Sequence, residues 1–162
     1  MTIDGLMFGI EKSIRYHQRR RAHYEELHKA VMLGVIVSGS AAFANSMGHG
    51  PVMGLVAAIL GAVDLVFAFS HRARDHEILH RRFTELANRC RRAPESDVTE
   101  LERIRMEIET DEPPIYWEVE SDCYMEVAAA WGRKVDRPQN WTWWRRAMMH
   151  WWRFEGAPHA DA

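Results

Sequence analysis

The sequence predicts an all-α membrane protein, built as a two-transmembrane helical hairpin with long helical extensions and a cytoplasmic helical bundle. The first observation is a nearly uncharged block: Asp64 is the one formal charge between Lys29 and Arg72. The second is that the rest of the chain is rich in charge and carries apolar residues at helical spacing. These patterns divide the chain into an N-terminal cytoplasmic helix (1–29), a transmembrane hairpin (30–70), cytoplasmic helices (71–155) and a disordered tail (156–162).

The uncharged block has the length of two membrane helices joined by a tight turn. A helix needs about 20 mostly apolar residues to cross the hydrocarbon core. Residues 30–47 and 51–70 each approach that length, and the segment between them is rich in glycine and contains Pro51. The alternative is a helical hairpin buried in a soluble core, but soluble helices normally carry a charged face and these carry none.

Basic residues on both flanks of the block predict its orientation. The first flank contains Lys12, Arg15, Arg19, Arg20, Arg21 and Lys29, and the second contains Arg72, Arg74, Arg81, Arg82, Arg89, Arg91 and Arg92. The turn between the spans has no lysine or arginine. Because basic residues stay on the cytoplasmic side, we expect a multi-pass protein in a lipid bilayer with both termini in the cytoplasm.

Each predicted span carries small or polar residues along one face, at steps of three and four. On the second span these are Gly54, Ala57, Gly61, Asp64 and Ala68, and on the first they are Gly34, Ser38, Ala41 and Asn45. Small residues let helix backbones approach closely in lipid. The two rows either face each other within one hairpin or face a neighbouring subunit, and the sequence leaves both open.

Asp64 is the residue in the spans that most needs an explanation. An ionised carboxylate at membrane depth costs about 2.5–3.5 kcal/mol on insertion scales, so it must be paired, protonated or hydrated. One hypothesis is a hydrogen bond from Ser38 of the same hairpin. The other is a ring of Asp64 side chains around a cation-preferring path, with Ser38 and Asn45 as further pore or gating candidates.

Three further helices are expected between residue 71 and residue 131. The first continues the second span to about residue 92 as one long helix. The second begins at Asp97, with Glu100 placed to complete a capping box, and ends before Pro113. The third runs to about Trp131 and has Tyr116, Val119, Cys123 and Val127 on one side.

A last helix, residues 140–154, is dense in tryptophan and arginine. Its candidates for the membrane interface are Trp141, Trp144, Trp151, Trp152 and Arg145. Tryptophan favours the interface and arginine favours lipid phosphates. The alternative is that this aromatic face packs on the other cytoplasmic helices.

Several function classes are disfavoured. A net charge of -2 argues against nucleic acid as a partner. The motif His76-Glu77-Ile78-Leu79-His80 matches the H-E-x-x-H of zinc hydrolases, but charged neighbours and the lack of an evident third ligand make this alternative weak. We therefore expect no enzyme activity, no metal and no cofactor.

The order of these elements and three short motifs resemble one known family. The motifs are H-x-x-L-H-R-R-F-x-x-L at residues 76–86, E-P-P-I-Y at 112–116 and D-C-Y-M-E at 122–126. With the two spans and the tryptophan-rich end, the chain resembles the SLATT family of bacterial two-transmembrane effectors, named for association with nucleotide-generating SMODS and sensor SLOG proteins.

The resemblance implies a function rather than a set of catalytic residues. It implies a homo-oligomeric pore-forming effector of a bacterial defence or conflict system, located in the inner membrane. It also implies that any nucleotide-sensing partner is a separate protein. The alternative from another class is a membrane-anchored scaffold or interaction protein without a pore.

Overall fold

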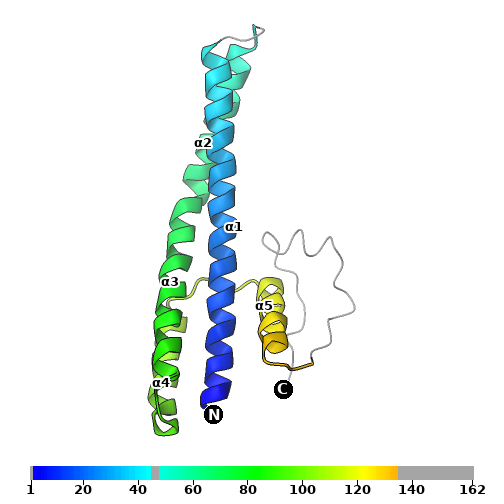
Figure 1. Ribbon diagram of the computed structural model, residues 1–162. Coiled ribbons are helices and arrows are strands. Elements are labelled where there is room, and N and C mark those ends of the chain that lie inside the picture. Colours follow the sequence, from blue (N-terminus) through cyan, green and yellow to red (C-terminus); the bar gives the residue numbers. More distant parts are fainter. Residues whose placement is uncertain (1, 45–47, 135–162) are drawn as a thin grey trace. The chain divides into compact units, whose positions relative to one another are not determined.

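The computed structural model describes residues 2–44 and 48–134, and all regular structure in these residues is helical (Figure 1). The helices are α1 (Ile3–Phe43), α2 (Gly50–Phe67), α3 (Phe69–Cys90), α4 (Val98–Thr110) and α5 (Trp117–Ala130), with a 3-10 turn at Glu95–Asp97 before α4. The predicted all-α class is thereby confirmed for the described residues. The expected tryptophan-rich helix, with Trp141, Trp144, Arg145, Trp151 and Trp152, lies outside them, as do Asn45 and the tail.

The chain divides into two compact units that share helices α1 and α3. Among the described residues, the bundle unit contains 2–19 and 77–134, and the helix-pair unit contains 20–44 and 48–76. The helix α1 begins in the first unit and ends in the second as one helix of 41 residues. The predicted N-terminal helix and first span are therefore one continuous element.

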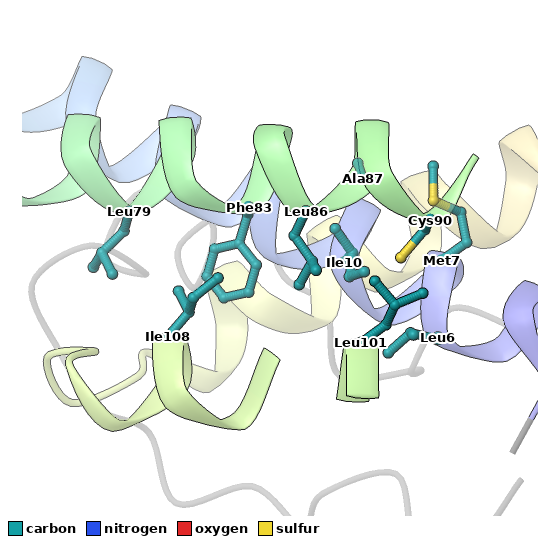
Figure 2. Packing of buried hydrophobic residues seen from close by; sticks show 10 residues of the cluster. All are labelled: Leu6, Met7, Ile10, Leu79, Phe83, Leu86, Ala87, Cys90, Leu101 and Ile108. Atoms are coloured by element: carbon teal, nitrogen blue, oxygen red, sulfur yellow. The ribbon is translucent and has the colours of Figure 1, made fainter. Parts of the chain in front are cut away.

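The core of the bundle unit lies where α1, α3 and α4 meet. Figure 2 shows side chains from these three helices pointing toward one another, with Phe83 of α3 fully buried among them. The cluster consists of Leu6, Met7, Ile10, Leu79, Phe83, Leu86, Ala87, Cys90, Leu101 and Ile108. Along each helix they are separated by one, three, four or seven residues, spacings that keep them on one side of that helix.

Helix α5 packs on α1 through two smaller apolar clusters and a row of ion pairs. Phe8 contacts Val127 and Ala128, and Tyr16 contacts Val119 and Cys123. Arg19 of α1 bonds both Asp122 and Glu126. Lys12 also pairs with Glu120. Basic side chains of α1 therefore match acidic side chains of α5.

The beginning of α4 differs from the capping box that the sequence predicts. Asp97 makes no capping hydrogen bond to the helix. The residue closes the preceding 3-10 turn with helical backbone angles, φ -92° and ψ 0°, whereas a capping residue is normally extended. Its carboxylate accepts a hydrogen bond from the Ser96 hydroxyl at 3.0 Å instead.

Two helical stretches are long and apolar enough to cross a membrane: α1, and residues Gly50–Cys90, which comprise α2 and α3. Their most apolar parts lie in the helix-pair unit. In each, only 6% of the most apolar 18-residue segment is buried inside the protein. The exposed large side chains of this unit include Leu33, Ile36, Val37, Phe43, Val52, Leu55, Val56, Ile59, Leu65, Val66 and Phe67. Apolar surface on this scale needs an apolar environment.

The ion pairs between α1 and α5 lead to a prediction about Cys123. This thiol is buried, and burial raises its pKa to about 12, so it should react slowly with maleimide. Replacing Arg19 by Gln removes about 1 kcal/mol of α5 docking, and labelling of Cys123 should accelerate about fivefold. The matched control is Arg103→Gln, which removes ion pairs within α4 alone. Equal labelling rates in both variants would contradict the role of Arg19.

Candidate functional site

Within the helix-pair unit, α1 and α2 run antiparallel and touch through small residues (Figure 1). A side-chain carbon added at Gly34 would lie 2.8 Å from Leu60, and one added at Gly54 would lie 3.8 Å from the Cβ atom of Ala42. These two contacts define the register of the pair. Gly34 and Gly54 are therefore places where the two helices approach closely.

Asp64 lies on the side of α2 that faces α1, and its partner there is His28. The Nδ1 atom of His28 is 2.9 Å from Oδ1 of Asp64, with the two side chains 35% and 18% exposed. Asp64, the one formal charge of the spans, thus joins the two helices. Sequence reasoning missed His28, which stands two residues before the first predicted span.

The hypothesis that Ser38 holds Asp64 is wrong for this structure. Ser38 is buried, and its hydroxyl donates to the Gly34 carbonyl oxygen of its own helix at 2.6 Å. Ser38 and Asp64 do not lie opposite each other in the register of the two helices. The actual register pairs 42 with 54, 34 with 60 and 28 with 64, which places Asp64 level with the charged end of the first span.

The sequence predicts that the second span continues to about residue 92 as one long helix, but that helix is interrupted at Ala68, four residues past Asp64. Ala68 has φ 47° and ψ 49°, the left-handed conformation that costs a residue with a Cβ atom about 1–2 kcal/mol. Its N–H donates to the Asp64 carbonyl oxygen at 2.8 Å, and its own carbonyl oxygen accepts from Arg72. In the residues that the structure describes, Ala68 alone combines a positive φ with a side chain.

The interruption changes which face of the chain points at α1. Beyond Ala68, the inward residues are Phe69 and Ala73, which pack with Tyr24 of α1, and His76, whose ring stacks on Tyr24 at 5.7 Å. In an uninterrupted helix, at 100° per residue, these residues would lie roughly 120–180° away from Asp64. The left-handed residue therefore lets α2 and α3 each turn their own inner face toward α1.

The remaining residues of the predicted contact rows are placed unevenly. Ala41 and Ala57 are half-buried, and Ala68 is exposed. A side-chain carbon at Gly61 would meet no atom within 4 Å. Gly61 is therefore a small residue that leaves open space beside α2 within this chain.

The H-E-x-x-H motif does not gather into a metal centre in the described part of the chain. His76 is buried against Tyr24, and the Nδ1 atom of His80 lies 3.3 Å from the Ile14 carbonyl oxygen. Within residues 2–44 and 48–134, no group of three His, Cys, Asp or Glu side chains is placed to hold a metal ion.

A shallow hollow of about 350 Å³ lies in the bundle unit at the end of α3. Its lining includes the arginines Arg89 and Arg92 together with the carboxylate residue Asp97. This lining does not define a ligand. We take the contact between His28 and Asp64 as the candidate functional site, because it holds the one charged residue of the predicted spans.

Comparisons with protein-family models, with curated proteins and with solved structures find no match.

The two glycines lead to a matched prediction about the helix pair. Gly34→Ile overpacks the contact with Leu60 and should lower the free energy of unfolding in detergent by about 1–3 kcal/mol. Gly61→Ile adds a side chain in open space and should change that free energy by less than about 0.5 kcal/mol. Equal losses would show that α2 turns the Gly61 side toward α1 in the detergent-bound protein.

A second prediction concerns His23, which precedes the first span. Burial, reinforced by the positive charge of Arg20, lowers the pKa of His23 to about 4. An unfolded histidine titrates near 6.5, so the unfolded chain binds the extra proton between these values. Stability should therefore fall as the pH drops from about 6.5 to about 4.

The test is thermal unfolding across that pH window. His23→Gln should flatten the slope of stability against pH, whereas the exposed His71→Gln should leave it unchanged. An unaltered slope in His23→Gln would show that another group carries the pH dependence.

Proposed function

We propose that this protein is a homo-oligomeric two-span effector of the bacterial inner membrane, which opens a pore when it is triggered. The proposal includes membership of the SLATT family, suggested by the motifs at residues 76–86, 112–116 and 122–126. The trigger would come from a separate nucleotide-sensing protein. The observation that carries the proposal is the pairing of Asp64 with His28 inside a helix pair whose outer surface is apolar.

The exposed surface of the helix pair supports a membrane location. The most apolar segment of a core helix in a soluble protein would be mostly buried, whereas only 6% of the corresponding 18-residue segment of each helix is buried here. Basic residues before and after the spans support placing both termini and the bundle unit in the cytoplasm. The spans would then form a transmembrane hairpin whose turn, near Gly48, lies outside the cell.

The position of Asp64 suits a pore that is closed at rest. The carboxylate faces α1 rather than the surroundings, so the outer face of one hairpin offers a lipid bilayer little that is charged. A conducting path through several copies requires polar groups along its axis, and Asp64 is the acidic group available in the spans. Gly61, with open space beside it, is the small residue available for contact between copies.

The same pairing also favours a second candidate function, a membrane-anchored scaffold without a pore. In a scaffold, Asp64 and His28 serve only to hold the two spans together. A carboxylate used only for packing can be replaced by an amide, which still accepts a hydrogen bond from His28. A carboxylate that selects cations cannot be replaced in this way, because the charge is lost.

Ion flux across vesicles distinguishes the two functions. Purified protein in phosphatidylethanolamine and phosphatidylglycerol vesicles should conduct ions after addition of extract from the source cells. Asp64→Asn should lower the cation-over-anion permeability ratio about threefold or more. Asp75→Asn, which removes an exposed carboxylate paired with His71 within α3, is the matched control and should leave the ratio unchanged.

Two results would contradict the proposal. Inserted protein that never permeabilises vesicles, with or without extract, would contradict the pore, and this is the result that the scaffold predicts. Flux whose ion selectivity is identical in the wild type, Asp64→Asn and Asp75→Asn would contradict the role of Asp64 in that pore.

A further inference from the structure

Three features of the helix-pair unit meet within about one helical turn. The Asp64 side chain bonds α1 through His28, and the Asp64 carbonyl oxygen accepts the N–H of Ala68. Ala68 itself is held in the left-handed conformation. The rings of Phe67 and Phe69, on either side of it, stack at 5.6 Å. A strained backbone position is thus placed directly beside the contact that joins the two spans.

Relief of the strain at Ala68 has a defined geometric result. If Ala68 becomes helical, α2 and α3 form one regular helix in which Asp64 and the inward residues of α3 lie on nearly opposite faces. Phe69 and Ala73 cannot then face α1 at the same time as Asp64. With α3 kept in place by Tyr24, α2 must rotate by more than about 100° about its axis.

We propose that Ala68 is a hinge, that the bond between His28 and Asp64 holds it in the bent state, and that release rotates the Asp64 carboxylate from the α1 side to the outer face of α2. This regulates the pore of the proposed function and rests on it: the bent state conceals the carboxylate, and the straight state presents it to neighbouring copies. Strained conformations of this kind persist only where surrounding contacts maintain them.

A disulfide across the helix pair measures the rotation without using ion flux. The Cβ atom of Ala42 lies 3.8 Å from the position of a Cβ atom at Gly54, within the range of disulfide geometry. The variant Ala42→Cys/Gly54→Cys leaves His28, Asp64 and Ala68 intact. The native Cys90 and Cys123 are both buried, so oxidation should join the introduced pair first. Rotation of α2 would separate the two introduced thiols.

Substitutions at the hinge should act in opposite directions in this background. Ala68→Val disfavours the left-handed conformation further and should slow disulfide formation about tenfold. Ala68→Gly accepts that conformation without strain and should form the disulfide at least as fast as the parent. The control is Ala62→Val on the exposed side of α2, which should leave the rate unchanged.

Loss of the bond between His28 and Asp64 should have the same effect on the rate of disulfide formation as Ala68→Val. His28→Ala should slow disulfide formation about tenfold, since a hydrogen bond to a charged group is lost. The exchanged pair His28→Asp/Asp64→His should restore the rate, which separates a lost contact from a misfolded variant. His71→Ala, which breaks an exposed histidine–aspartate pair within α3, should have no effect.

The outcomes separate the hinge from the pore. Slower disulfide formation in His28→Ala and Ala68→Val together with increased vesicle flux supports both, and the oxidised disulfide should block flux until it is reduced. Slower formation without flux in any variant supports the hinge and contradicts the pore. Unchanged formation in both variants overturns the hinge, whatever the flux.

Discussion

A charged group inside an apolar helix pair has to find a partner on the neighbouring helix, and the arrangement of the helix-pair unit follows from that requirement. Asp64 reaches His28 only in a register that also places Gly34 against Leu60 and Gly54 near Ala42. The glycines allow the approach and the ionisable pair selects the register, because apolar contacts alone would permit neighbouring registers at similar energy. The same register brings Tyr24 to the start of α3.

Helix α1 uses its two ends in different ways. Its first half carries the basic residues on which the proposed cytoplasmic location rests, and the structure shows Lys12 and Arg19 bonded to carboxylates of α5. The orientation rule counts lysine and arginine rather than net charge, so this neutralisation leaves the proposed topology unchanged. Arg19 is thus both one of the basic residues that precede the first apolar segment and a contact that holds α5 to α1.

The helical class, the apolar face of α5 and the two membrane-length helices could be predicted from the sequence, because burial on one face leaves a regular spacing and a long apolar helix leaves an uncharged run. The partner of Asp64 could not be predicted. The register of α1 against α2 depends on where the turn between them is centred, and a turn segment with several glycines allows more than one centre. The interruption at Ala68 did leave a signal. Asp64 is out of phase with Phe69, Ala73 and His76, so one straight helix could not have turned Asp64 and these three residues toward α1 together.

The sharing of α1 between the two units also has a consequence for synthesis. The N-terminal residues of α1 are completed first, yet the partners that cover them come much later: the Trp131 indole N–H bonds Glu11 across 120 positions of sequence. Contacts so distant along the chain form slowly and only after the last helices have left the ribosome. Under the proposed function, both apolar helices are available for insertion before the bundle unit can close, so the nascent chain would reach the bilayer with the bundle unit still unassembled.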